Sequence, residues 1–158
     1  MAVSITSEAL VLNREFSNEE YKRYARLIDE RRSSGYYHHV IIEDAAGKRL
    51  ETPGTHECLG VISLLDHYGF PRDLTGKTVL DVGCNSGFYS FVAKLRGAKS
   101  VLGLDASRDY TEQALLLREI LGLNVEFHCI DGHSLDENFG SFDFVICGYG
   151  RLPTPAGA

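Results

Sequence analysis

The second half of the chain alternates short apolar runs with stretches in which apolar residues recur at helical spacing. Each apolar run predicts a buried strand, and each intervening stretch predicts a helix that a glycine ends. Strands and helices that alternate in this way are typical of βαβ units, which form a parallel sheet with right-handed crossovers. The predicted strands cover residues 78–82, 100–105, 125–131 and 142–147, and the predicted helices cover residues 88–96 and 108–121.

A helix is also predicted near the N-terminus, over residues 18–32. Ser17 and Glu20 have the spacing of a capping box, and apolar residues recur at helical spacing after them. Another face of this helix is rich in basic side chains, which would suit contact with a phosphate backbone. Acidic residues lie among them, which favours an ordinary solvated face. The basic residues are Lys22, Arg23, Arg26, Arg31 and Arg32.

The next segment predicts a hairpin and a second helix. Aromatic and β-branched residues over 36–42 lead into the polar turn 44–48, a pattern typical of a strand or a small hairpin. Apolar residues at helical spacing then predict a helix over 55–68, which Gly69 ends. An extension of helix, hairpin and helix therefore precedes the alternating half of the chain.

Length and composition suit a single soluble globular domain. The chain has 158 residues, of which 44% are hydrophobic and 24% charged, which excludes a fibrous or disordered protein. We expect an α/β fold with a Rossmann-like open parallel sheet over residues 76–150 that ends at its fourth strand. The extension occupies residues 1–75, and an irregular tail occupies residues 151–158.

The charge balance and the absence of long apolar runs limit the partners. Sixteen Lys and Arg residues against 22 Asp and Glu residues give a net charge of −6, which does not favour a surface that neutralises many phosphates. A local nucleic-acid patch stays open. No apolar run approaches the roughly 20 residues that span a bilayer, and the N-terminus lacks the features of a signal peptide. We therefore expect a cytoplasmic protein without membrane contact.

Metal ligation is not indicated. His128 and His133 flank Asp131, but no third ligand follows at the spacing of a zinc site. The cysteines contain no Cys-x-x-Cys pair, and a cytosolic location disfavours disulfides, so we expect reduced thiols. These cysteines are Cys58, Cys84, Cys129 and Cys147.

The turn after the first strand of the predicted sheet is the most informative segment. Gly83 permits a tight turn, and Gly87 removes a Cβ where a ligand would approach the helix N-terminus. Dinucleotide-binding loops carry Gly-x-Gly-x-x-Gly, but Asn85 and Phe88 replace the second and third glycines, so a pyrophosphate would meet side chains. Asp81 would also repel phosphate and favour a cation such as an ammonium or sulfonium group.

Two further acids follow the next two predicted strands. Asp105 ends one strand, where a carboxylate can accept hydrogen bonds from both hydroxyls of a ribose. Asp131 ends the next, placed to accept a hydrogen bond from an adenine amino group. All three acids can also be read as ordinary polar residues at strand ends. Their occurrence at successive strand ends beside a glycine-bounded turn favours a ligand site.

Catalytic residues are not evident. His38 and His39 adjoin a predicted strand, so one side chain should point inward and the other outward. A buried or surface histidine is favoured over a catalytic base at both positions. Tyr89 follows the turn, and ligand contact and core packing stay equally open for it.

These residues resemble class I S-adenosylmethionine-dependent methyltransferases, in particular a small bacterial group related to the enzymes that modify the wobble uridine of tRNA. The resemblance covers residues 36–147 and is strongest over 80–90. It implies S-adenosylmethionine as cofactor, with the methionine portion held by the turn, the ribose by Asp105 and the adenine met at Asp131. The implied cofactor-binding residues are Asp81, Gly83, Cys84, Asn85, Gly87, Phe88, Asp105, Ala106, Asp131, Gly132 and Cys147.

The sequence departs from this family at two places. The family commonly has Gly where Asn85 stands, although related members tolerate other residues there. The family also continues beyond the fourth strand, whereas residues 151–158 are rich in proline and poor in apolar residues. We expect the cofactor half of the fold, with the C-terminal part missing or altered by truncation or a shifted reading frame; a naturally short protein is the second explanation.

The predicted function is methyl transfer to an acceptor, either a small molecule or tRNA, that the sequence does not identify. One alternative is an NAD-dependent oxidoreductase, which the βαβ pattern and Asp105 favour and the spacing of the glycines opposes. The other alternative is a cofactor-binding fragment without turnover.

Overall fold

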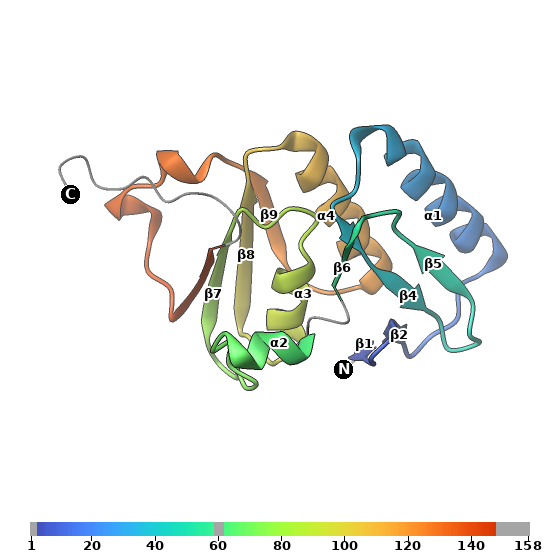
Figure 1. The fold of residues 1–158 in the computed structure, drawn as a ribbon, viewed down its shortest axis with the longest axis horizontal. Coiled ribbons are helices and arrows are strands. Elements are labelled where there is room, and N and C mark those ends of the chain that lie inside the picture. Colours follow the sequence, from blue (N-terminus) through green and yellow to red (C-terminus); the bar gives the residue numbers. More distant parts are fainter. Residues whose placement is uncertain (1–2, 59–61, 148–158) are drawn as a thin grey trace.

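The computed structural model describes residues 3–58 and 62–147, and its central element is a four-stranded parallel sheet. The strands lie in the order β10-β7-β8-β9 (Figure 1). Helices α3 and α4 join β7 to β8 and β8 to β9, which confirms the predicted alternation of strand and helix. The bounds are Thr78–Val82 for β7, Phe88–Leu95 for α3, Ser100–Asp105 for β8, Arg108–Leu121 for α4, Glu126–Cys129 for β9 and Phe144–Cys147 for β10.

Strand β9 is shorter than predicted, and the reason is local. After Cys129 the backbone N–H of Ile130 donates to the Asp105 carbonyl at 2.9 Å. Asp131 then caps a short 3-10 helix by accepting a hydrogen bond from the His133 N–H. The chain therefore leaves the sheet before Asp131. The 3-10 helices here are η3, Gly132–Ser134, and η4, Glu137–Phe139.

A second four-stranded sheet, in the order β1-β2-β4-β5, is formed by the N-terminal half. The predicted hairpin is present as β4 and β5, whereas the short strands β1 and β2 were not predicted. Helix α1 packs against β5, and its capping box between Ser17 and Glu20 is formed as predicted. The bounds are Val3–Ile5 for β1, Leu10–Leu12 for β2, Asn18–Glu30 for α1, Arg32–Ser34 for the 3-10 helix η1, Ile41–Glu43 for β4 and Arg49–Glu51 for β5.

The second predicted helix, over residues 55–68, is wrong in its first part. Strand β6, His56–Glu57, occupies this part and pairs in parallel with β3, His38–His39. The pairing holds because the His56 N–H donates to the Tyr37 carbonyl at 2.9 Å. Helix α2 covers only Ile62–His67.

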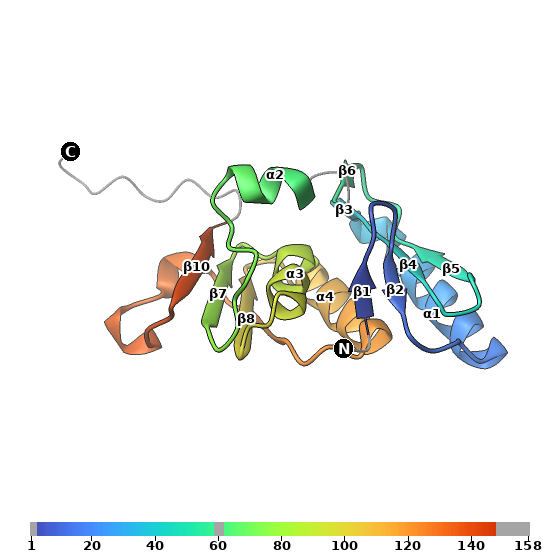
Figure 2. The same ribbon diagram turned by 90° about the horizontal axis from the view of Figure 1, so that it is seen from below.

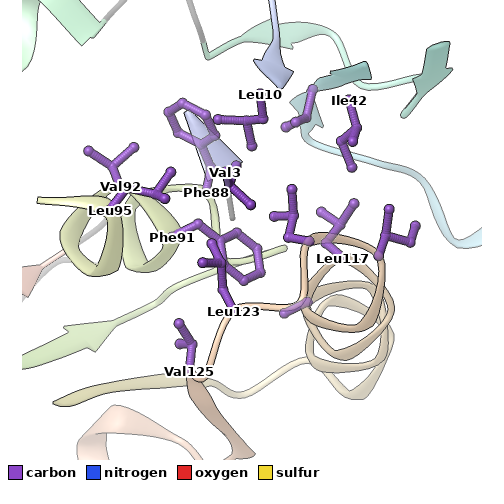
Figure 3. Packing of buried hydrophobic residues seen from close by; sticks show 14 of the residues in the cluster. Val3, Leu10, Ile42, Phe88, Phe91, Val92, Leu95, Leu117, Leu123 and Val125 are labelled. Atoms are coloured by element: carbon purple, nitrogen blue, oxygen red, sulfur yellow. The ribbon is translucent and has the colours of Figure 1, made fainter. Parts of the chain in front are cut away.

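The two sheets share one hydrophobic core. Helices α3 and α4 lie between them, as Figures 1 and 2 both show. Figure 3 shows Val3, Leu10 and Ile42 of the N-terminal sheet packed toward Phe88 of α3 and Leu117 of α4. The N-terminal half is therefore part of the structural support of α3, the helix that follows the predicted cofactor turn.

The basic face of α1 is largely engaged in ion pairs. Arg23 pairs with Glu119 of α4 at 2.6 Å, and Arg32 pairs with Asp29 at 3.0 Å. Arg26 pairs with Glu30 within the helix at 3.8 Å. Within the described residues, no helix is long and apolar enough to cross a membrane.

Candidate functional site

The turn between β7 and α3 has the backbone conformation that its sequence requires. Gly83, Asn85 and Gly87 have φ values of 73°, 54° and 85°, all in the left-handed region. Asparagine tolerates this region better than most other side chains, which explains how it can stand in a position where glycine is common. The Gly83 and Cys84 N–H groups both donate to the Leu104 carbonyl, so β8 holds the turn in place.

Gly87 has a structural role that the sequence did not predict. A Cβ at this position would lie 2.6 Å from the ring of Phe127, a residue of β9. A Cβ at Gly103 in β8 would lie 2.5 Å from the same ring. The missing Cβ of Gly87 thus makes room for the core side chain of Phe127.

Asp81 is buried beneath the turn, with 1% of its surface exposed. Its Oδ2 accepts a hydrogen bond from the Ser90 hydroxyl at 2.6 Å, while Oδ1 has no hydrogen-bond partner among the described residues. Burial raises the pKa of this carboxyl from 3.8 to about 7; the Ser90 hydrogen bond lowers it and the nearby Asp105 charge raises it further. A buried carboxyl with a free oxygen favours a cationic or hydrogen-bond-donating group brought next to it.

Asp105 is held in a fixed orientation by the backbone around it. Its Oδ2 accepts a hydrogen bond from the Asn85 N–H, and its Oδ1 accepts one from the Ser107 N–H, both at 2.8 Å. Each carboxylate oxygen can accept a second hydrogen bond. The carboxylate therefore links the turn to the end of β8 and keeps capacity for the two hydroxyls of a ribose.

Asp131 follows the end of β9 by two residues, at the same edge of the sheet, and is exposed. Its Oδ1 accepts hydrogen bonds from the His133 backbone N–H at 2.9 Å and lies 3.1 Å from His133 Nδ1. The adjacent Gly132 packs closely on β7, because a Cβ there would lie 2.7 Å from a methyl group of Val82.

The structure brings the predicted site residues to the carboxyl edge of the parallel sheet, but their side chains differ in burial. The side chains of Cys84 and Phe88 are buried, as is that of Asp81, so they support the turn from below. Ala106, at the end of β8, is exposed, as is Cys147, at the end of β10.

Sequence reasoning did not identify the link between this turn and the N-terminal half. His38 of β3 is 2% exposed, and its Nδ1 lies 3.0 Å from the hydroxyl of Ser86 in the turn. Burial, together with the nearby His56, lowers the pKa of His38 to about 4, so its imidazole is neutral near pH 7. The prediction that one of the adjacent histidines points inward is confirmed, since His39 is only partly buried and pairs with Glu51 at 2.9 Å.

The Thr52-Pro53-Gly54 segment fixes the backbone of His38. The Thr52 hydroxyl donates to the His38 carbonyl at 2.7 Å and accepts from the Val40 N–H at 2.8 Å. A Cβ at Gly54 would lie 2.2 Å from the His38 backbone, so only glycine fits this crossing. No local sequence signal predicts these contacts, because each joins residues that are distant in the chain.

The molecule belongs to the open α/β proteins, which bind ligands at the carboxyl ends of their parallel strands. Residues 79–156 match the family model described as a methyltransferase domain. The chain therefore carries a class I S-adenosylmethionine-dependent methyltransferase domain, as the resemblance implied.

Individual relatives agree with this assignment. A tRNA U34 carboxymethyltransferase of Campylobacter concisus is 35% identical over 75 residues, which are 48% of this chain and 26% of that protein. A ubiquinone biosynthesis O-methyltransferase of Neisseria meningitidis is 38% identical over 85 residues, covering 52% of this chain and 36% of that protein. The chain thus spans about a quarter to a third of the length of these relatives.

The architecture is also found among solved structures. A ribosomal protein L11 methylase from Lactobacillus delbrueckii aligns with 91% of this chain and 62% of its own, with a TM-score of 0.51 and 19% identity. At this identity the likeness concerns the fold alone. Because the alignment covers most of the chain, it extends beyond the residues of the matched family model.

Proposed function

We propose that this chain binds S-adenosylmethionine at the carboxyl edge of β7, β8 and β9 and takes part in methyl transfer. The observation that carries this proposal is the buried carboxyl of Asp81, whose Oδ1 has no partner among the described residues. It lies next to the left-handed turn and in the same row as Asp105 and Asp131. S-adenosylmethionine supplies an activated methyl group on a sulfonium, and its amino acid end carries an ammonium.

The residues of the site fit the parts of this cofactor. Asp81 is the predicted acceptor for the ammonium, either directly or through a water molecule at the turn. Asp105, already oriented by two backbone N–H groups, accepts hydrogen bonds from the ribose hydroxyls. Asp131 accepts a hydrogen bond from the adenine amino group. No group is assigned as a general base, and positioning of donor and acceptor is the expected contribution to the rate.

The acceptor belongs to the proposal only as a broad class. The relatives act in tRNA modification and in ubiquinone synthesis by their names, so the comparisons do not select one acceptor. We propose a small molecule or tRNA, and the mostly paired basic face of α1 does not favour tRNA.

The experiment is a calorimetric titration of the chain with S-adenosylhomocysteine, with NAD titrated in parallel. Asp105→Ala removes the acceptor of the ribose hydroxyls and should weaken binding by about 1–3 kcal/mol. Asp109→Ala is the matched control, because it removes an exposed carboxylate of α4 outside the row of strand ends. Binding that weakens in Asp105→Ala but not in Asp109→Ala supports the proposal. Binding of NAD in preference to S-adenosylhomocysteine would establish the oxidoreductase alternative instead.

A further inference from the structure

The side from which a methyl acceptor approaches follows from where the parts of the cofactor lie. Asp81 and Asp105 lie at the carboxyl ends of the neighbouring strands β7 and β8, and Asp131 follows β9 by two residues. If the methionine portion lies at the turn beside Asp81 and the ribose at Asp105, the sulfonium that joins them lies beside the turn that leads into α3. The acceptor must come in line with the bond from sulfur to methyl, and therefore reaches the start of α3.

A cluster of rings stands at this place and comes mostly from the N-terminal half. The ring of Tyr37 stacks on that of His56, with centroids 4.9 Å apart and an angle of 10° between the ring planes. Tyr37 is 38% exposed, and His56 is partly buried. Tyr37 directly precedes β3, and His56 lies in β6, which pairs with β3. His38 of β3 contacts the rings of Phe88 and Tyr89 in α3.

His38 connects this ring pair to the cofactor turn. Its imidazole lies 5.3 Å from the Tyr37 ring and 5.9 Å, edge to face, from the ring of Tyr89 in α3. Its Nδ1 is also the atom within hydrogen-bonding distance of the Ser86 hydroxyl. The buried imidazole of His38 therefore contacts both the turn, through Ser86, and the rings of Tyr37 and Tyr89.

We propose that Tyr37, His56 and Tyr89 line the acceptor site and that this site takes a planar ring bearing a hydroxyl group. Flat side chains favour stacking of a flat acceptor, and the phenol and imidazole groups supply polar contacts at its edge. This inference rests on the proposed function and specifies its substrate class.

The transfer balances without any further reactant. A bond forms between the acceptor oxygen and the methyl carbon while the bond between sulfur and that carbon breaks. The electron pair of the broken bond stays on sulfur, which becomes the thioether of S-adenosylhomocysteine. The proton of the acceptor hydroxyl passes to water.

The test is a ligand-observed NMR titration of the full chain in the presence of S-adenosylhomocysteine. Catechol serves as a ring that bears hydroxyl groups, uridine as a ring that carries carbonyl groups in their place, and ethanolamine as a hydroxyl without a ring. The variants are Tyr37→Ala, Tyr37→Phe and Tyr68→Ala. Tyr68 is the matched control, because it is 79% exposed and also contacts a histidine ring, that of His67. Thermal unfolding of each variant checks that it is folded.

We expect catechol to bind, and Tyr37→Ala to raise its dissociation constant roughly tenfold. Tyr37→Phe and Tyr68→Ala should change it little. Preference for uridine over catechol would contradict the proposed hydroxyl on the ring. If no ring probe binds to a chain that binds S-adenosylhomocysteine, or if Tyr37→Ala and Tyr68→Ala behave alike, the inference is refuted while the proposed function stands. If S-adenosylhomocysteine itself does not bind, the proposed function is refuted, and the inference fails with it.

Discussion

Replacing Asp81 by Asn separates the stability of the turn from its ability to bind a ligand. The substitution keeps the shape of the side chain and its position beside Ser90 but removes the ionisable group. Because Asp81 is 1% exposed, its charged form is disfavoured by burial in the folded chain. We expect Asp81→Asn to stabilise the folded chain at high pH.

The size and pH range of the effect follow from the pKa of Asp81. The folded chain has a pKa of about 7 at this group against an ordinary value of 3.8. Because the pKa of Asp81 is raised in the folded chain, the contribution of this group to the free energy of unfolding is fully present below pH 3.8. It is lost as the pH rises through about 7. A difference of about three pKa units corresponds to roughly 4 kcal/mol, which is an upper limit because the buried group can relax.

The assay is urea unfolding of the wild-type chain and of Asp81→Asn without ligand, at about pH 4, 6 and 8, which span the titration of Asp81. The two free energies of unfolding should be similar near pH 4 and should diverge toward pH 8, with the variant more stable. Asp109→Asn, which removes an exposed carboxylate of α4, is measured alongside. Parallel curves for the wild type and Asp81→Asn over the whole range would refute the reasoning.

The same variant should bind S-adenosylhomocysteine less tightly than the wild type at pH 8, although it is more stable there. A gain in stability with a loss of binding is expected for a buried charge that serves a ligand. A variant that gains stability and keeps full affinity would show that Asp81 has only a structural role.

Two further predictions concern the support of the turn. Gly87→Ala should lower the free energy of unfolding by more than about 2 kcal/mol, and Gly122→Ala should lower it less. Both glycines have positive φ, but only a Cβ at Gly87 would meet a ring, that of Phe127, at 2.6 Å. Urea unfolding measures both losses, and equal losses would contradict the role of Phe127. His38→Phe and Ser86→Ala should each weaken S-adenosylhomocysteine binding, and the double variant should lose no more than the larger single loss, since one hydrogen bond joins them. Calorimetry checks this, and additive losses would show that the two residues act separately.

The sheet that carries the site could be predicted from the sequence because its signals are local. Strands β7 and β8 have the predicted bounds, since each is an apolar run between polar or glycine residues. Gly122 ends α4 in the left-handed conformation, as the pattern indicates. The row of acids followed from the same pattern, because the carboxyl ends of parallel strands share one edge of a sheet.

The remaining features depend on contacts between distant residues. Strands β1 and β2 have three residues each, which is too short for an alternating pattern to show. Strand β6 exists only because it pairs with β3, and its residues otherwise fit the start of a helix. The contact between His38 and Ser86 spans 48 positions, so neither residue has a local sequence signal for it.

We expect a ligand with the parts of S-adenosylmethionine to bind along the carboxyl ends of β7, β8 and β9. Backbone amide NMR during a titration with S-adenosylhomocysteine tests this directly. The largest shifts should fall on the amides of Gly83, Asn85 and Asp105 and continue to Asp131, with little change in β1 and β2. Shifts confined to another surface, such as the pocket that Leu27 of α1 and Leu116 of α4 line, or no shifts in a folded chain, would contradict this binding site.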